Sequence, residues 1–229
     1  MSVVDILAIA AHPDDVEVTC AGLLLRMADR GYKTGVLDLT RGEMGTKGTP
    51  EIRDREAAAA AGIMGLALRE NARLPDSRLA LNDESRIWVA SCLRRLRPRI
   101  VVIPADGQRH PDHNAAGEIA YAAIFVAGLS KFSTDHPAHR PDKVLYTVAG
   151  IDRAPSFYVD ITGQMERKLQ AVASYFSQFG ARGEPVYSAI ESSARHFGSR
   201  CGVRYAEGYF IKQSLLIDDP ISELRTNPV

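Results

Sequence analysis

Apolar runs of strand length alternate along this chain with stretches whose apolar residues recur at helical spacing. Residues 3–11 (VVDILAIAA) predict a buried strand, and residues 19–31 predict a helix that ends at a glycine. Residues 33–40 predict the second strand. Thr49 can then cap a helix whose first residue is Pro50, since proline fits the first helical position.

The same alternation continues to the C-terminal part of the chain. Further strands are expected near residues 72–74 and over 99–105, 143–150 and 156–162, with helices over 83–96 and 163–176. About five strand–helix units are expected before residue 130. This order is typical of an α/β protein with a mostly parallel sheet covered by helices on both faces. We find no repeat or linker, so residues 1–229 are expected to form a single domain.

Composition and charge exclude several classes of protein. The 28 basic and 28 acidic side chains give a formal net charge of +0, which does not indicate a nucleic-acid partner. The three cysteines, with no CxxC pair, favour a reducing cytoplasm over a disulfide scaffold. The N-terminus lacks a basic leader, and the longest uncharged run, residues 119–130, is shorter than a membrane span of roughly 20 residues. A cytoplasmic protein that does not contact a membrane is expected.

Two similar stretches stand where predicted strands end. Residues 10–17 read AAHPDDVE and follow directly on the first predicted strand, whereas residues 109–114 read RHPDHN and lie in the loop after the predicted strand 99–105. In open α/β sheets, ligands bind beyond the carboxyl ends of the strands. Neighbouring parallel strands would therefore bring these two polar loops together.

Imidazole nitrogens and carboxylate oxygens are ordinary ligands of zinc, and a catalytic zinc typically takes three protein ligands and one water. His12, Asp15 and His113 would supply the three. Asp14 could accept the proton of the water as a general base. His110 would stay off the metal and, when protonated, stabilise an oxyanion, while Asp112 would hold its ring and raise its pKa. Such a set hydrolyses an amide or an ester.

Simpler explanations exist for each residue. A single histidine at a strand end is more often a hydrogen-bonded loop residue, and an aspartate before a helix is more often its cap. Two His-Pro-Asp loops after strands of one sheet favour the metal site. A nucleotide-binding protein is disfavoured because no GxGxxG turn follows the first strand, and a serine hydrolase because no GxSxG is present. A metal-binding protein without catalytic activity stays open.

The motifs AHPDD and HPDH together resemble those of the LmbE-like, or PIG-L, zinc-dependent de-N-acetylases, which have a Rossmann-like fold. Residues 38–65 and the RHPDH stretch resemble the branch of that family that acts in bacillithiol biosynthesis. The resemblance implies removal of acetate from N-acetylglucosaminyl-malate, with Zn²⁺ on His12, Asp15 and His113. It implies the same roles for Asp14 and His110 as above, and a homo-oligomer, commonly a hexamer.

Substrate contacts are also implied by the resemblance. Arg53 and Arg109 fall where groups that bind the malate or the sugar are expected, and Glu43 would line the mouth of the site. On the residues alone, Arg53 could equally form a surface ion pair with Glu56 or Asp54.

Several points stay open at this stage. The substrate could instead be another N-acetylglucosamine derivative, such as an inositol conjugate or an oligomer, or the amide of a thiol conjugate. A site with two histidines and one aspartate also accepts iron, cobalt, nickel or manganese. The segment 195–210 could close the pocket or pack against another subunit. Family members often carry a run of glycines after the first motif, whereas this chain has only Gly22 there.

Overall fold

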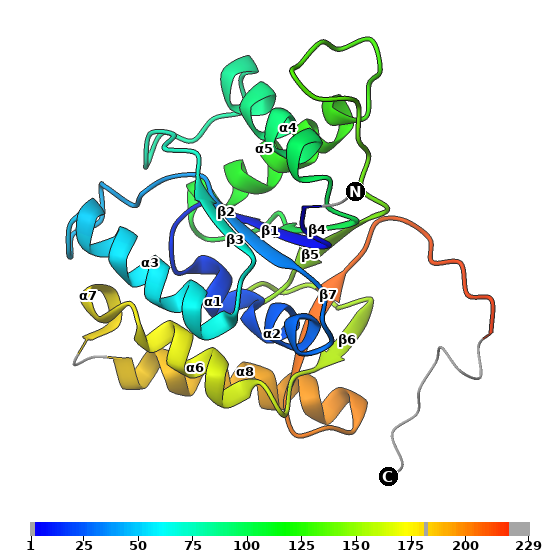
Figure 1. Cartoon of the computed structure of the whole chain (residues 1–229). Coiled ribbons are helices and arrows are strands. Elements are labelled where there is room, and N and C mark those ends of the chain that lie inside the picture. Colours follow the sequence, from blue (N-terminus) through cyan, green and yellow to red (C-terminus); the bar gives the residue numbers. More distant parts are fainter. Residues whose placement is uncertain (1–2, 181–182, 220–229) are drawn as a thin grey trace.

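A computed structural model describes residues 3–180 and 183–219, which form one α/β domain built on a single sheet. Its seven strands lie in the order β3-β2-β1-β4-β5-β7-β6 (Figure 1). Their bounds are β1 Ile6–Ala10, β2 Thr34–Asp38, β3 Leu68–Asn71, β4 Ile100–Pro104, β5 Lys143–Thr147, β6 Phe157–Asp160 and β7 Ala206–Phe210.

The sheet is mostly parallel, as predicted. Strands β1 to β5 run parallel to one another, so their carboxyl ends share one edge of the sheet. Strand β7 lies antiparallel between β5 and β6. Residues 206–210, the last part of the segment 195–210, are therefore an internal strand of this sheet.

Helices cover both faces of the sheet, which confirms the predicted layering (Figure 1). One face carries the pair α4 and α5, and the other carries α1, α2, α3, α6 and α8, with the short α7 after α6. Their bounds are α1 Asp15–Thr19, α2 Ala21–Asp29, α3 Pro50–Met64, α4 Asp83–Leu96, α5 Pro111–Ala127, α6 Met165–Ala173, α7 Phe176–Phe179 and α8 Gly183–Cys201.

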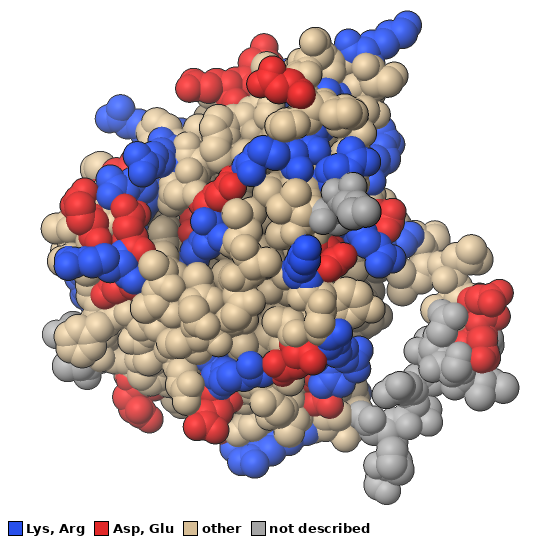
Figure 2. Space-filling model, viewed as in Figure 1, with Lys and Arg blue, Asp and Glu red and all other residues tan. Residues whose placement is uncertain are grey.

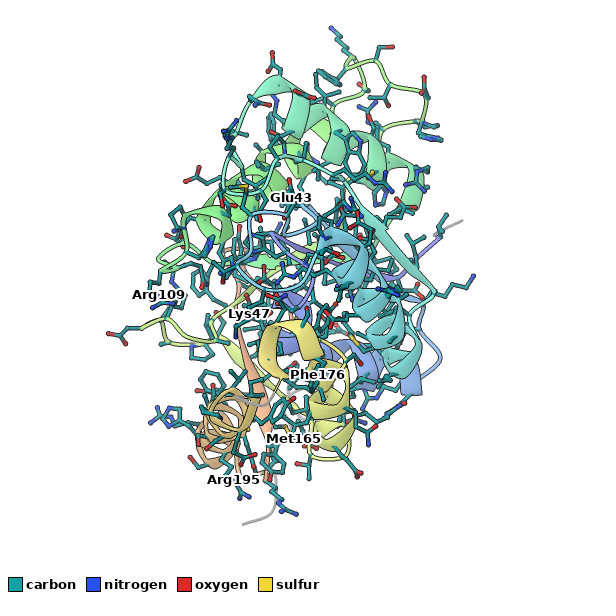
Figure 3. The ribbon with its side chains drawn as sticks, turned by 90° about the vertical axis from the view of Figure 1, so that its left-hand side faces the viewer. Glu43, Lys47, Arg109, Met165, Phe176 and Arg195 are labelled. Atoms are coloured by element: carbon teal, nitrogen blue, oxygen red, sulfur yellow. The ribbon has the colours of Figure 1, made fainter. Side chains whose placement is uncertain are left out.

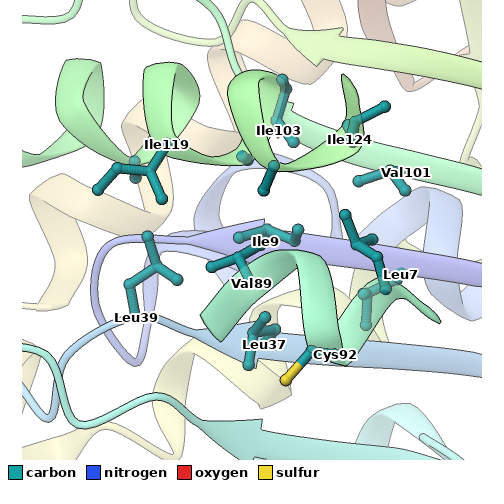
Figure 4. Packing of buried hydrophobic residues seen from close by; sticks show 14 of the residues in the cluster. Leu7, Ile9, Leu37, Leu39, Val89, Cys92, Val101, Ile103, Ile119 and Ile124 are labelled. Atoms are coloured by element: carbon teal, nitrogen blue, oxygen red, sulfur yellow. The ribbon is translucent and has the colours of Figure 1, made fainter. Parts of the chain in front are cut away.

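Alternation of side chains along the strands divides the core into two layers. In β1, Leu7 and Ile9 pack toward α4 and α5, whereas Ile6 and Ala8 pack toward the opposite layer of helices. Figure 4 shows the first layer, in which branched side chains of β1, β2 and β4 meet those of the two helices. Because both faces are buried, the central strands read as continuous apolar runs in the sequence.

Local signals predicted most element boundaries. Thr49 caps α3, since its hydroxyl accepts a hydrogen bond from the N–H of Ile52 at 3.3 Å, and Pro50 is the first helical residue. Two expectations were wrong. The third strand is Leu68–Asn71 rather than residues 72–74, and four strand–helix units rather than five precede residue 130 in the described part of the chain.

The predicted helix over residues 19–31 corresponds to α2, and the separate short helix α1 precedes it, with Cys20 between the two. Gly22 lies in the first turn of α2, where a Cβ atom would come within 2.6 Å of Ile161 and 2.7 Å of Glu207. Glu207, in β7, accepts hydrogen bonds from the backbone N–H groups of Gly22 and Leu23 at 2.9 and 2.8 Å. The lone glycine thus permits a carboxylate from β7 to cap α2.

Basic and acidic side chains are interspersed over the face of the molecule in Figure 2, in keeping with the balanced composition. Each helix within residues 3–180 and 183–219 is too short or too polar to cross a lipid bilayer.

Candidate active site

The two His-Pro-Asp stretches meet at the carboxyl edge of the sheet, as the topology predicts. The first follows β1 and leads into α1, and the second follows β4 and leads into α5. Strands β1 and β4 are hydrogen-bonded neighbours. The rings of His12 and His113 consequently lie 5.5 Å apart between centroids, although the residues are far apart in the sequence.

His12, Asp15 and His113 form a compact group of ligand atoms. The Nδ1 of His12 lies 3.4 Å from Oδ2 of Asp15, and the Nε2 of His113 lies 3.1 Å from Oδ1 of the same carboxylate. One ligand atom from each residue lies within 4.8 Å of the others. Two ligands that each lie about 2.0–2.1 Å from a tetrahedral zinc are about 3.3 Å apart. The spacing of these side chains therefore fits a metal ion.

Asp76 is a member of the site that the sequence reasoning missed. Its Oδ1 lies 3.0 Å from the Nε2 of His12, and its side chain is buried. Asp76 follows β3, so it lies at the same edge of the sheet as the two motifs. Its position after a strand was the available signal, but the surrounding sequence, LPDSRLA, carries no histidine and resembles an ordinary turn.

The carboxylates shift the titration of the histidine at the centre of the site. Burial alone would lower the pKa of His12, but hydrogen bonding and charge from Asp15, together with the charge of Asp76, raise this pKa to about 9. Burial would raise the pKa of Asp15, but the hydrogen bonds from His113 and His12 hold it well below its ordinary value. The site is therefore strongly anionic around one imidazole, an environment that suits a cation.

Asp14 adopts a strained backbone conformation beside these residues. Its φ is 115°, which is unusual for a residue other than glycine. Burial and the neighbouring charge of Asp15 raise the pKa of Asp14 well above its ordinary value. Its Oδ2 accepts a hydrogen bond of 2.8 Å from Nη2 of Arg53.

The contact with Asp14 shows that Arg53 does not form a surface ion pair. The residue is buried, with 6% of its surface exposed, so it is not the surface ion pair with Glu56 or Asp54 considered above. Its guanidinium packs against Gly42, where a Cβ atom would overlap Nη1 at 1.6 Å. Arg53 therefore holds Asp14 in place, and a role in gripping the substrate is not needed to explain its burial.

The predicted partnership of His110 and Asp112 is not observed. Nδ1 of His110 accepts the backbone N–H of Asp112 at 3.2 Å and so caps α5. The carboxylate of Asp112 instead accepts the N–H of Ser77 at 2.7 Å and lies 3.5 Å from Nε2 of His12. Burial and the nearby rings of His113 and His12 lower the pKa of His110, contrary to the expected rise.

A loop between β2 and α3, residues 41–48, covers this group of side chains. The carboxylate of Glu43 accepts the N–H of Asp76 at 2.9 Å, and the N–H of Met44 donates to Asp76 at 2.8 Å. Lys47 and Gln178 exchange hydrogen bonds of 3.0 and 2.9 Å, which join the loop to α7. Figure 3 shows Glu43 and Lys47 over the middle of the molecule. Glu43 is thus bonded to the segment that carries Asp76, and its role at the mouth of the site stays a prediction.

Arg109 differs from the other candidate residues in its surroundings. It is exposed, and it lies at the margin of the molecule in Figure 3. The structure brings Asp14 and Asp112 together with the three metal-ligand candidates. Arg109 is instead exposed to solvent.

An apolar recess adjoins the ligand group. Its volume is about 30 Å³, and Asp15 and His113 form part of its wall. The remaining wall is mostly apolar and is made by residues of β1, α1 and β4, among them Ile9, Val16, Val102 and Ile103. A space of this size next to the candidate metal site can hold a methyl group or one water molecule.

A parallel α/β sheet whose carboxyl edge gathers two histidines and one aspartate with matched spacing is typical of a metal-assisted hydrolase. Residues 7–124 match the family of GlcNAc-PI de-N-acetylases, PIG-L. The chain therefore belongs to this family, as its two motifs indicated.

The chain is also similar to individual deacetylases and to a protein of known structure. The chain is 31% identical to diacetylchitobiose deacetylase of Thermococcus kodakarensis over 89% of its own length and 81% of that protein. It is 27% identical to 1D-myo-inositol 2-acetamido-2-deoxy-alpha-D-glucopyranoside deacetylase of Rhodococcus erythropolis over 65% of this chain and 63% of that one. The crystal structure of the conserved protein TT1542 from Thermus thermophilus superposes with a TM-score of 0.89 and 42% identity, covering 93% of this chain and 97% of that one.

Proposed function

We propose that this protein removes the N-acetyl group from a conjugate of N-acetylglucosamine by metal-assisted hydrolysis of the amide. The observation that carries the proposal is the cluster of His12, Asp15 and His113, whose ligand atoms lie within 4.8 Å of one another and so support a zinc site. Membership of the PIG-L family and the names of the relatives support the same reaction and the same class of sugar.

These three residues would hold Zn²⁺, with Fe²⁺ and other divalent ions as alternatives for the same ligand set. When bound, such an ion polarises the amide carbonyl and lowers the pKa of water at the site to about 7. Asp76 would orient the ring of His12 through its Nε2, the outer hydrogen bond that metal-binding histidines usually make.

Asp14 is the proposed general base. It lies next to Asp15, its side chain is only 14% exposed, and its raised pKa makes it a better proton acceptor than an ordinary aspartate. Arg53 fixes the orientation of this carboxylate through one of its oxygens. The strained backbone of Asp14 is explained by the same requirement, since the turn must aim two successive carboxylates at one site.

His110 is the proposed partner of the oxyanion that forms as the amide is attacked. Its ring stacks on that of His113 at 4.8 Å between centroids, so it lies beside the metal ligands without being one of the three. Because Nδ1 accepts a backbone N–H, the opposite nitrogen carries the ring proton and is the one available to donate. Asp112 would help to hold the ring of His12 rather than that of His110.

Two candidate substrates are proposed. N-acetylglucosaminyl-malate is the first, because residues 38–65 resemble the branch that acts in bacillithiol biosynthesis. Diacetylchitobiose is the second, because of the 31% identity to the deacetylase that carries its name. Arg109, which is exposed at the surface, is the candidate for binding the malate of the first substrate.

The test is an assay of free amine release from both substrates by the zinc-loaded protein. Asp14→Asn should lower kcat by about 10²–10⁴ while the protein retains its metal. His113→Ala should lose metal and activity together. A protein that binds zinc but releases no amine from any N-acetylglucosamine conjugate would instead be a non-catalytic metal-binding protein. The homo-oligomer that the resemblance implies is tested separately by light scattering.

A further inference from the structure

A second and larger cavity lies beside the candidate active site. Its volume is about 300 Å³. Thr19 lines both this cavity and the small recess that Asp15 and His113 border, so the two spaces adjoin the same side chain. Thr19 ends α1, whose first residue is Asp15, and its hydroxyl donates to the carbonyl of Asp15 at 2.7 Å.

The walls of the cavity are mainly apolar. Helix α8 contributes one side, and α1, β7 and the segment after β5 contribute the others. The apolar residues are Val18, Ala149, Ala189, Ile190, Ala194, Phe197 and Ala206. An empty apolar cavity of about 150 Å³ is large enough to bind benzene. A cavity of twice that volume can accept a ring or a short alkyl chain.

Lys168 is a charged residue in this mainly apolar wall. Its side chain is 3% exposed, and its Nζ donates to Oε1 of Glu207 at 2.5 Å. Glu207 is fully engaged, because it also accepts the N–H groups that begin α2 and the hydroxyl of Tyr209 at 2.6 Å. Among the contacts of the described residues, this ion pair uses one of the three N–H groups of Lys168.

A buried ammonium with donors to spare is unfavourable unless an acceptor reaches it. Because Lys168 lines the cavity, a ligand there can supply that acceptor. Glu207 balances the charge of Lys168, so a neutral oxygen serves as well as an anion. The cavity therefore suits a group with an apolar body and an oxygen acceptor.

We propose that this cavity is a substrate subsite, and that it binds an apolar aglycone carrying an oxygen acceptor on the N-acetylglucosamine whose acetamide reaches His12, Asp15 and His113. The inference rests on the proposed deacetylase function. It goes beyond that function by assigning an apolar class to the group attached to the sugar, in place of the polar malate and sugar groups of the two substrates named above.

The first experiment measures binding of methyl and hexyl N-acetylglucosaminides to the zinc-loaded Asp14→Asn protein by calorimetry. The hexyl glycoside should bind about tenfold to a thousandfold more tightly, the range expected when about five further methylene groups are buried. A 5-oxohexyl glycoside should bind at least as tightly as the hexyl compound, because its carbonyl can accept from Lys168. Equal affinities for methyl and hexyl glycosides would overturn the proposal, and a tenfold loss with the ketone would overturn the role of Lys168.

Two neighbouring serines of α8 provide a matched pair of variants. Ser193 lines the cavity, whereas Ser192 is exposed and does not. Ser193→Leu should fill the cavity and remove most of the gain from the hexyl chain, while Ser192→Leu should keep it. The same gain in both variants would place the chain elsewhere and refute the subsite. Substitution of Lys168 is avoided because it would leave Glu207 buried without its partner.

Kinetics with the wild-type protein separate the two proposals. Amine release that does not depend on the length of the chain would support the deacetylase and overturn the subsite. Binding that depends on chain length, with no amine released from any glycoside, would support the cavity as a binding site and overturn the deacetylase.

Discussion

The Oδ1 atom of Asp76 lies 3.0 Å from Nε2 of His12, while the other ring nitrogen of His12 faces Asp15. The imidazole is thus held from both sides by carboxylates. Asp76 is itself bonded to the backbone N–H of Met44 in the loop over the site. The orientation of a proposed metal ligand is therefore connected to the position of that loop.

This connection predicts the behaviour of Asp76→Ala. Without its carboxylate the ring of His12 can rotate, and affinity for zinc should fall by about 10–100-fold. Competition with a chromophoric chelator measures the change. Asp83→Ala, at an exposed position, should bind zinc as the wild type does. Unchanged affinity in Asp76→Ala would mean that Asp76 does not orient the ligand.

Arg53→Lys separates the positioning of Asp14 from binding of substrate. Lysine keeps the charge but lacks the planar fork that directs a hydrogen bond to Asp14. We expect kcat to fall about tenfold with KM changed by less than about twofold. Arg55→Lys, at an exposed position of the same helix, is the control. A raised KM with normal kcat would instead assign Arg53 to the substrate.

Gly22→Ala tests the close approach of α2 to β7. The added methyl group would meet Ile161 and Glu207 at less than 3 Å, so the free energy of unfolding should fall by about 1–3 kcal/mol. Gly62→Ala is matched to it, because Gly62 also lies in a helix but has open space around it. That change should stabilise the protein by about 0.4–1 kcal/mol. Urea denaturation distinguishes the two, and equal effects would contradict the packing argument.

Arg69→Met tests a buried network behind the site. Arg69 donates to Glu17 at 2.5 Å and to Asp38 at 2.8 Å, and both carboxylates are buried. Removing the guanidinium leaves two buried negative charges, which should lower the free energy of unfolding by about 3–5 kcal/mol at neutral pH. Arg78→Met, on the surface, should change it by less than about 0.5 kcal/mol.

The loss in Arg69→Met should depend on pH in a defined direction. Burial already raises the pKa of Asp38 above its ordinary value, although Arg69 opposes the shift. Without Arg69 this pKa rises further, so the folded state binds more protons than the unfolded state as pH increases past about 4. Stability is then lost with rising pH, and the deficit should be larger near pH 8 than near pH 5. A deficit that shrinks with pH would contradict this assignment.

The sequence predicted the parts of the site that local rules control. His12 and His113 each follow an apolar strand and precede a helix, and a parallel sheet brings such loops together. The cap at Thr49 follows from the chemistry of a single turn. The fold class and the layering of helices were predictable for the same reason, since they depend on short-range periodicity.

What the sequence could not predict depends on pairing over long distances. The strand β3 reads LREN and has no apolar run, because an edge strand can carry charges, so its predicted position was wrong by four residues and Asp76 went unnoticed beyond it. The carboxylate of Asp112 could reach either histidine, and its bond to Ser77 decides between them. The insertion of β7 between β5 and β6 has no signal in its own five residues.

That insertion has a consequence for the order in which the molecule can assemble during synthesis. In the described part of the chain, β6 has only β7 as a hydrogen-bonded neighbour, and the first turn of α2 receives its cap from Glu207 of the same strand. Until residue 210 has left the ribosome, β6 has no strand to pair with and the start of α2 has no acceptor. The five parallel strands can form earlier, but the cavity beside the active site cannot. A nascent chain stalled before β7 should therefore remain a target for chaperones even when its candidate metal ligands are already in place.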